Sequence, residues 1–458
     1  MKPMRRIITL LLALSLVAAA CGDDDDADTT AAPGTTAATE TTASTDTTEA
    51  TDTTAAPEPT TAPDTTEALP SGVTLSWWGF GATGLEPRIA EWEAATGNTV
   101  EIKNAGFDEH HEALLTALAS GAVPDIGIVE VGYSSLFKAN PQVFVDLRDL
   151  GAADLEGDFL DWRWEHGVAA DGTVTGIPTD VGGMAVAYRW DLFEQAGLPT
   201  DRDEVCALWQ NDWNDFIDVG AQFVEATGIP FFDVAGALYQ AVLNQGTNKY
   251  YTDDGELIYE TSEQNIKAWD LAVKAINANL SANIANFSPE WNAGMANGDF
   301  ALLMAPAWMM GYIQGQAPDT SGQWDIACMP EGGGNWGGSQ LSIPAASENQ
   351  ALAWDLITYV LSSDSQFQVF VENGNFPSIP ALYDTPEVRE FSNEFFNNAP
   401  VGQIYSDSAK SLVPIFEGEH ERAILREFGN GLLRIEQGLE DPATAWETSL
   451  EAVSLVTG

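Results

Sequence analysis

The stretch from Trp291 to Ser342, WNAGMANGDFALLMAPAWMMGYIQGQAPDTSGQWDIACMPEGGGNWGGSQLS, decides the fold that we expect. It contains two apolar runs, Phe300 to Met304 and Asp325 to Met329, that are typical of buried strands. A proline follows each run, and a tryptophan comes next, Trp308 in one case and Trp336 in the other. Indole rings give broad flat contact area, and the neighbouring glycines let a ligand approach the backbone. We therefore predict that this stretch forms a wall of a cleft.

An alternative is that both tryptophans are ordinary core aromatics. Trp336 lies between a glycine triplet, Gly332 to Gly334, and a glycine pair, Gly337-Gly338, which favours a loop position. Trp308 directly follows a continuous apolar run, and burial statistics do not choose between core and cleft for it.

The first 21 residues have the composition of a bacterial lipoprotein signal. Lys2, Arg5 and Arg6 precede an apolar run from Ile7 to Ala20, which is short for a membrane span and typical of a secretory segment. The small residues before Cys21 resemble a lipobox, with alanine in place of the usual leucine. Plain secretion, with Cys21 left as a free thiol, is the alternative. We expect lipidation of Cys21, which would anchor the chain to the outer face of the cell membrane.

Residues 22–71 are predicted to form a disordered tether. Seventeen of these fifty residues are Thr, twelve are Asp or Glu, and none is Lys or Arg. Such a segment cannot bury enough apolar surface to offset its chain entropy. A mixture of threonine, proline and acid is also the composition of stalks that carry O-linked sugars. We expect the segment to provide reach.

The chain is strongly acidic. Its formal charge is −51, of which residues 1–21 carry +3 and residues 22–71 carry −12, so residues 72–458 carry −42. Nucleic-acid binding depends on basic side chains that neutralise phosphate, so we exclude that class of partner. Neutral or cationic ligands are compatible with the charge, whereas polyanions are not. The low lysine content is typical of actinobacterial proteins. If Cys21 is lipidated, Cys206 and Cys328 are the remaining cysteines and could form a disulfide, but their spacing in the sequence does not decide whether they pair.

Residues 72–458 alternate between strand and helix patterns. Val73 to Trp78 and Val123 to Val129 indicate strands that are apolar on both sides, and helical patterns follow each. We therefore predict an α/β fold with a largely parallel sheet, and candidate cleft residues where these strands end. Further helices are expected at 191–198, capped by Asp191, at 213–227, and at 262–280, where Ile266, Trp269, Val273 and Ile276 lie on one face.

Several motifs in order resemble one family. They are Ala119 to Asp125 (ASGAVPD), Gly176 to Asp180 (GIPTD), Tyr188 to Leu198 (YRWDLFEQAGL), Gly298 to Met304 (GDFALLM) with Trp308, Gly337 to Ser339 with Leu341 to Pro344, and Asn375 to Ser378 (NFPS). Their order and spacing over residues 73–450 are similar to those of family 1 extracellular solute-binding proteins. These are carbohydrate receptors of bacterial ABC importers, such as maltose-binding and cellobiose-binding proteins.

The resemblance implies a type II periplasmic-binding-protein fold. It has two α/β lobes, each discontinuous in sequence, that are joined by three hinge crossings. We place the crossings near Ile177-Pro178, Met329-Pro330 and Pro377. Lobe 1 would then comprise residues 72–178 plus 331–376, and lobe 2 residues 179–330 plus 377–458.

The resemblance also implies a ligand site between the lobes. Carried over by motif, the expected ligand-binding residues are Trp78, Gly79, Phe80, Glu130, Asp180, Trp308, Trp336, Gly337, Gly338 and Phe416. Aromatic faces would stack on sugar rings, and carboxylates would accept hydrogen bonds from sugar hydroxyls. We expect a monomeric receptor, without enzymatic activity, that closes on a neutral sugar, most simply an oligosaccharide, and delivers it to the permease subunits of an ABC importer.

Two other classes of function stay open. A secreted glycoside hydrolase would need two carboxylates about 5–10 Å apart, a role that Glu130 and Asp180 could fill. A polyamine or metal receptor could share the fold, and Tyr250-Tyr251 resembles the paired tyrosines of ferric receptors. Asp253-Asp254-Gly255 marks a hairpin turn there, so strand tyrosines are the simpler interpretation. His110-His111-Glu112 lacks the spacing of a zinc helix, and no P-loop or dinucleotide motif occurs, so we expect no metal and no cofactor.

Overall fold

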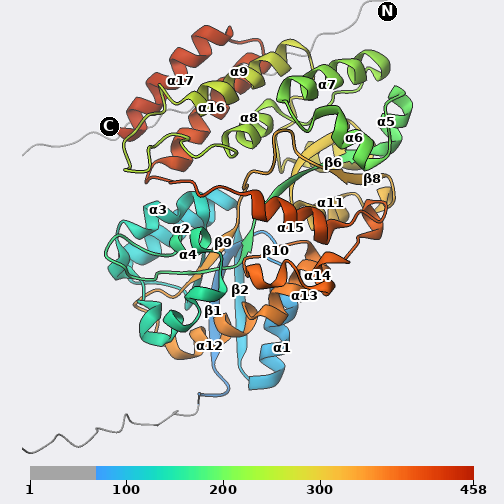
Figure 1. Cartoon of the computed structure of the whole chain (residues 1–458). Coiled ribbons are helices and arrows are strands. Elements are labelled where there is room, and N and C mark those ends of the chain that lie inside the picture. The colour runs from blue at the N-terminus through green and yellow to red at the C-terminus, as the bar shows by residue number, and fades with distance from the viewer. Residues whose placement is uncertain (1–68) are drawn as a thin grey trace, which may run out of the picture. The chain divides into compact units, whose positions relative to one another are not determined.

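The structure is a computed structural model that describes residues 69–458. The predicted signal segment, its Cys21 and nearly all of the predicted tether lie outside the described residues. The described residues belong to one compact unit, in which two main sheets are surrounded by helices (Figure 1). None of the helices in residues 69–458 combines the length and the apolar character that crossing a bilayer requires.

The first sheet has five strands. β1 pairs in parallel with β2 and β3, because helices connect these three consecutive strands. β9 pairs antiparallel with β3 and β4, so the prediction of a largely parallel sheet holds only for the first three strands. β9 reaches the sheet after a long excursion of the chain, and no crossover helix fixes its direction. In spatial order the strands are β2 (Thr99–Ala105), β1 (Thr74–Phe80), β3 (Ile126–Glu130), β9 (Ser339–Ser342) and β4 (Ile177–Pro178).

The second sheet is antiparallel throughout, in the order β7 (Leu302–Pro306), β6 (Met184–Arg189) and β8 (Trp324–Ala327). All six residues of β6 are buried. Val186 and Tyr188 pack into one apolar cluster, and Ala185 and Ala187 pack into another on the opposite face. Both faces are therefore covered, which gives the continuous apolar runs seen in the sequence. Such runs report burial on both faces and do not indicate whether the strands run parallel or antiparallel.

The chain passes between the two sheets near two of the three positions where hinge crossings are predicted. It leaves the five-stranded sheet after Pro178, enters the three-stranded sheet at Met184, and returns between Ala327 and Ser339. Two short strands, β5 (Asp180–Val181) and β10 (Phe376–Pro377), pair antiparallel with each other. The division into two lobes at these positions, and their movement as hinges, stays a prediction.

Helices cover both sheets. α1 packs on α12, α2 on β1 and α3 on β3, while α8 packs on α9 and α16 on α17 (Figure 1). One local prediction is wrong: the N-cap of α5 is Arg189, whose guanidinium pairs with Asp191 at 2.7 Å. In α9 the predicted face is buried at Trp269 and exposed at Ile266. The helices are α1 Glu86–Thr96, α2 Phe107–Ser120, α3 Val131–Lys138, α4 Asp161–Glu165, α5 Trp190–Ala196, α6 Arg202–Trp209, α7 Trp213–Thr227, α8 Ala235–Leu243, α9 Glu263–Asn277, α10 Pro289–Asn297, α11 Met309–Gln316, α12 Gln350–Val360, α13 Ser363–Asn373, α14 Pro386–Arg389, α15 Val401–Ser411, α16 Glu421–Glu436 and α17 Pro442–Thr457.

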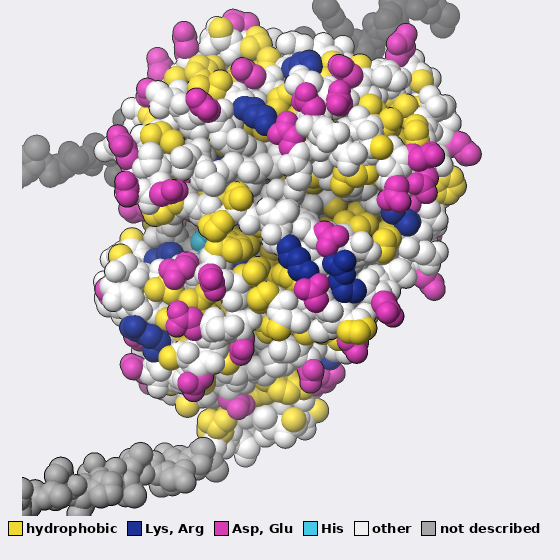
Figure 2. All heavy atoms as spheres, viewed as in Figure 1, with side chains coloured by type: hydrophobic (Ala, Val, Ile, Leu, Met, Phe, Trp, Pro, Cys, Tyr) yellow, Lys and Arg dark blue, Asp and Glu magenta, His cyan; other side chains and the backbone are white. Residues whose placement is uncertain are grey.

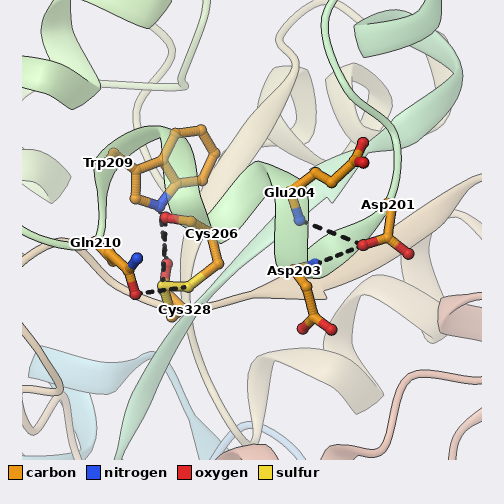
Figure 3. Close-up of a disulfide and its surroundings, with 7 residues drawn as sticks. All are labelled: Asp201, Asp203, Glu204, Cys206, Trp209, Gln210 and Cys328. Atoms are coloured by element: carbon orange, nitrogen blue, oxygen red, sulfur yellow. Dashed lines mark hydrogen bonds between the residues drawn. A yellow bond between two sulfur atoms is a disulfide. The ribbon is translucent and has the colours of Figure 1, made fainter.

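A disulfide joins α6 to the end of β8. Cys206 and Cys328 are 122 residues apart in sequence, and their Cα atoms are 5.3 Å apart (Figure 3). The Nε1 of Trp209 donates a hydrogen bond to the carbonyl of Cys328 at 2.9 Å. The pairing that the sequence leaves open is therefore present, and it lies directly before the glycine-rich segment that carries Trp336.

Candidate functional site

The two tryptophans singled out in the sequence lie together. Trp308 follows β7 and precedes α11, and Trp336 lies in residues 329–338, which we call the cleft loop. The Trp308 Nε1 donates to the Trp336 carbonyl at 3.1 Å, and the two rings meet edge to face with centroids 5.8 Å apart. Both side chains are half-buried and pack against the apolar core clusters.

Two glycines bring the cleft loop close to its neighbours. Gly337 and Gly338 have φ values of +86° and +99°, which residues other than glycine rarely adopt. A Cβ atom on Gly337 would lie 3.2 Å from the Trp308 Nε1 and 3.9 Å from the Glu130 Oε1. One on Gly338 would lie 2.9 Å from the carbonyl oxygen of Asp180. Glycine is therefore needed for the loop to approach both predicted carboxylate positions.

Glu130 is a carboxylate in an apolar and acidic setting. It ends β3 and caps α3, because its Oε2 accepts a hydrogen bond from the Gly132 backbone N–H at 2.8 Å. Burial and then the negative charge of Glu417 raise the pKa of Glu130 to about 7. Near neutral pH its carboxyl can therefore donate or accept a hydrogen bond, depending on its protonation state.

Asp180 is held from three directions. Its Oδ1 accepts hydrogen bonds from the Thr179 hydroxyl at 2.6 Å and from the Ser339 backbone N–H at 3.2 Å. Its backbone carbonyl accepts from the Arg163 Nε at 3.0 Å, and Arg163 also donates to the Ser339 carbonyl at 2.7 Å. Burial raises the pKa of Asp180. Arg163, which the sequence reasoning missed, fixes Asp180 and the start of β9 relative to each other.

A buried ion cluster completes the surroundings. The Lys249 Nζ lies 2.8 Å from both Glu417 Oε1 and Glu421 Oε1. Burial alone would lower the pKa of Lys249, but the two carboxylates outweigh it and raise the pKa. Glu421 shows the reverse balance, because burial raises its pKa to about 7 against the attraction of Lys249. One oxygen each of Glu417 and Glu421 has no hydrogen-bond partner within the described residues.

The sequence reasoning also missed Lys249, Glu417 and Glu421. Glu417 directly follows Phe416, which was predicted to contact the ligand. The residues around Glu417 form no strong sequence pattern, and nothing in the sequence indicates that Glu417 pairs with a lysine 168 residues away. Burial likewise lowers the pKa of the nearby His166 to about 3, so this imidazole is neutral. The charges in the cluster are thus those of one lysine and its carboxylate neighbours.

Comparison with known proteins identifies the family. A model of the bacterial extracellular solute-binding protein family matches residues 88–394, more than half of the chain. The chain belongs to this family. Family membership places it outside the cytoplasm and confirms the predicted resemblance.

Curated relatives of this solute-binding protein include sugar-binding proteins. An arabinooligosaccharide-binding protein of Halalkalibacterium halodurans is 25% identical over 369 residues, which cover 76% of this chain and 80% of the relative. A lactose-binding protein of Rhizobium radiobacter is 25% identical over 384 residues, which cover 78% and 87%.

Solved structures confirm the predicted fold class. An extracellular solute-binding protein of family 1 is 34% identical, with a TM-score of 0.75, over 84% of this chain and 100% of the other. The binding protein of an ABC transporter from B. animalis subsp. lactis, solved with β-1,6-galactobiose, is 22% identical with a TM-score of 0.71, over 82% and 96%. The latter likeness concerns the fold alone.

Among the described residues, the first-strand aromatics of this solute-binding protein make ring contacts with residues other than the tryptophan pair. Phe80 packs against Phe107 and His111, with centroids 4.9 and 5.3 Å away, and the backbone N–H of Glu130 donates to the His111 Nε2 at 3.1 Å. Phe80 is thus linked to Glu130 through one imidazole. Trp78 lies beneath the ammonium group of Lys103, and among the described residues no ring contact joins it to Trp308 or Trp336.

The remaining predicted ligand residues have local partners. Gly79 is buried, and a Cβ atom there would lie 2.8 Å from the Ile128 side chain. Phe416 is 41% exposed and packs edge-on against Tyr251, with centroids 5.8 Å apart. The structure therefore does not bring Gly79 or Phe416 into the group formed by the tryptophans, the glycines and the two carboxylates.

The features that suggested a metal receptor have structural partners. Tyr250 is buried and its hydroxyl lies 2.8 Å from that of Tyr239, while the His110 Nε2 lies 2.7 Å from the Ile128 carbonyl. Within residues 69–458, no three His, Cys, Asp or Glu side chains come together as a group of metal ligands. A surface hollow of about 480 Å³, lined by residues that include Asp212 and Lys267, lies outside the predicted site.

Proposed function

We propose that this solute-binding protein binds a neutral oligosaccharide between Trp308, Trp336 and the carboxylates Glu130 and Asp180, and delivers it to the permease of an ABC importer. The observation that carries the proposal is the joining of two half-buried indoles to the half-buried Glu130 and the buried Asp180 by a loop whose glycines exclude side chains. The names of the curated relatives support the same ligand class.

The geometry suits the two kinds of surface that a sugar presents. The apolar C–H face of a sugar ring can stack on an indole, and its hydroxyls can donate to a carboxylate. The acidity of the protein disfavours a phosphorylated or other anionic sugar. Figure 2 shows Asp and Glu side chains spread over the visible face, with few Lys and Arg side chains among them.

The way in which the receptor would work follows from the expected lobes. Closure of two lobes about the crossings would bury the sugar and present one surface to the permease. Only contacts made better in the closed state can favour closure. Cys21 would carry the lipid anchor, and residues 22–71 would give a monomeric receptor its reach from the membrane.

We propose no enzymatic step. The glycoside-hydrolase alternative requires a pair of carboxyl groups that are free to act on the scissile bond. The Oδ1 of Asp180 accepts hydrogen bonds from Thr179 and Ser339, so these partners hold the carboxylate in one orientation, which supports a binding role.

A thermal-shift screen of the full chain with Cys21→Ser tests this function. Glucose, galactose and arabinose, with their oligosaccharides of two to five units, would be compared with spermidine and ferric citrate. A ligand at a hundred times its Kd stabilises the folded state by about 2.7 kcal/mol. We expect an oligosaccharide to raise the Tm and to be recovered intact, and Trp308→Ala to weaken its binding by roughly 1–3 kcal/mol, by analogy with aromatic stacking against flat rings. A shift with spermidine or iron alone would refute the ligand class, and new reducing ends would indicate a hydrolase.

A further inference from the structure

Phe287 combines an exposed ring with an unfavourable backbone conformation. It lies in the segment before α10, its side chain is 49% exposed, and its φ is +63°. A bulky aromatic residue in the left-handed region is a genuine outlier, because its Cβ crowds the backbone. Outliers of this kind persist where the surroundings impose them, and they gather at functional sites.

The surroundings do impose this conformation, since residues 281–288 are firmly anchored. The backbone N–H groups of Ala282 and Ile284 donate to the carbonyls of Phe232 and Asp233 at 2.9 and 3.1 Å. The Asn286 side chain, next to Phe287, donates to the Asp233 Oδ2 at 2.6 Å. Asp233 is buried and accepts a further hydrogen bond from the Trp291 Nε1 at 2.8 Å. These hydrogen bonds hold the residues on either side of the left-handed turn in place.

Helix capping does not account for the ring. Ser288 is the N-cap of α10, so Phe287 occupies the position whose apolar side chain can pack against the fourth helical residue. That fourth residue is Asn292, whose amide oxygen accepts a hydrogen bond from the Tyr312 hydroxyl at 2.9 Å. A hydrophobic staple is thus absent here, and another reason is needed for an exposed phenyl ring.

The ring instead continues the aromatic surface of the candidate site. The planes of Phe287 and Trp308 are within 23° of parallel, and their centroids are 6.2 Å apart. Trp291 and Tyr312 support Phe287 from centroid distances of 5.1 and 5.5 Å. A sugar inserted between two faces would need about 3.5–4.0 Å on each side, or ~7–8 Å in total. The two rings are too close for a sugar to enter between them, so a sugar ring that contacts Phe287 must lie on the part of the phenyl ring that is turned away from Trp308.

We propose that Phe287 forms an outer subsite, on which a second or later ring of an oligosaccharide stacks while an earlier ring contacts Trp308 and Trp336. The inference rests on the proposed function and deepens it, because it makes the natural ligand longer than one sugar. The strain at Phe287 then serves to hold the phenyl ring outward beside Trp308. Phe287 is a binding residue that neither the motif order nor the apolar periodicity of the sequence singled out.

Two variants of the full chain test the proposal. Phe287→Asn removes the ring and keeps a residue that tolerates the left-handed backbone, whereas Phe287→Trp keeps an aromatic ring. Isothermal titration calorimetry would compare them with the wild type, using glucose, galactose, arabinose and their oligosaccharides of two to five units. We expect Phe287→Asn to weaken the longer ligands roughly fivefold to a hundredfold and to leave the monosaccharide unchanged. Phe287→Trp should bind the longer ligands like the wild type.

The outcomes separate this inference from the proposed function. If the wild type binds oligosaccharides and Phe287→Asn binds every length equally well, the outer subsite is refuted and the function stands. An equal loss for every length, or a Tm of Phe287→Asn well below that of the wild type, would assign Phe287 a structural role and also refute the subsite. If the wild type binds none of these sugars, the proposed function fails and the subsite fails with it.

Discussion

Replacing Lys249 tests whether the buried ion cluster holds the fold together near the candidate site. Lys249→Met keeps the aliphatic stem and removes a charge whose Nζ lies 2.8 Å from each of two carboxylates. The Lys249 and Glu421 side chains are each 4% exposed and that of Glu417 is 12% exposed, so solvent cannot replace the lost partner. Breaking a buried pair by removing one member costs about 3–5 kcal/mol. We expect a loss of that order in the free energy of unfolding at neutral pH.

The pH dependence of Lys249→Met gives a sharper signature. Without the ammonium group, burial and mutual repulsion place the folded-state pKa values of both Glu417 and Glu421 above the unfolded value of about 4.3. The folded variant then binds more protons than the unfolded chain, so its stability falls as the pH rises above about 4 and through neutrality. The deficit relative to the wild type should therefore be larger at pH 8 than at pH 5.

Urea unfolding at both pH values measures the effect, and Lys410→Met is the matched control. The Lys410 Nζ pairs with the exposed Asp384 at 2.6 Å, and this surface pair should contribute little. If Lys249→Met is as mild as Lys410→Met, or if its deficit does not grow between pH 5 and pH 8, the argument from buried charge is wrong.

Three further predictions concern the loop, the disulfide and Glu130. Gly337→Ala should abolish or strongly weaken sugar binding in calorimetry, because φ is +86° and the new methyl group meets the Trp308 Nε1 at 3.2 Å; wild-type affinity would contradict the proposed approach of the loop. Replacing both Cys206 and Cys328 by Ser should lower the free energy of unfolding by up to about 5 kcal/mol in the chain-entropy model for a 122-residue separation, and an unchanged denaturation midpoint in urea would argue against the pairing. Because the pKa of Glu130 is raised to about 7, its contribution to stability is full below the unfolded pKa of about 4.3 and is lost as the pH rises through 7. Glu130→Gln should therefore flatten the fall in Tm between pH 5 and pH 8, and an unaltered slope would contradict the assignment.

The positions of several helices and strands could be predicted from the sequence. Hydrophobic periodicity placed the helix at 213–227 with the bounds of α7, and apolar runs located β1 and β7 within two residues of their bounds. Strand direction was beyond such patterns, because a strand covered on both faces is apolar whether its neighbours run parallel or antiparallel. The partners of β9 depend on contacts that only the folded chain makes.

The site was predictable where local composition constrained it. Glycines around Trp336 indicated a close backbone approach, and the structure shows that approach at Gly337 and Gly338. The roles of Arg163 and Lys249 could not be predicted from the sequence, because the groups with which these side chains pair are brought close to them only by tertiary folding. Phe287 is a third case, because only its backbone angle and its exposed ring reveal it.

The cleft loop has a consequence for how such a receptor could change its specificity during evolution. Surface loops usually tolerate insertions and deletions, but this one is fixed at both ends. The Glu331 N–H donates to the Gln210 carbonyl at 2.9 Å, and the Gly338 carbonyl accepts from the Val131 N–H at 3.1 Å. A change in loop length would shift β9 against β3 as well as displace Trp336. New ligand preferences should therefore arise by replacing side chains in neighbouring segments, such as residues 281–288, while the length of the cleft loop stays constant.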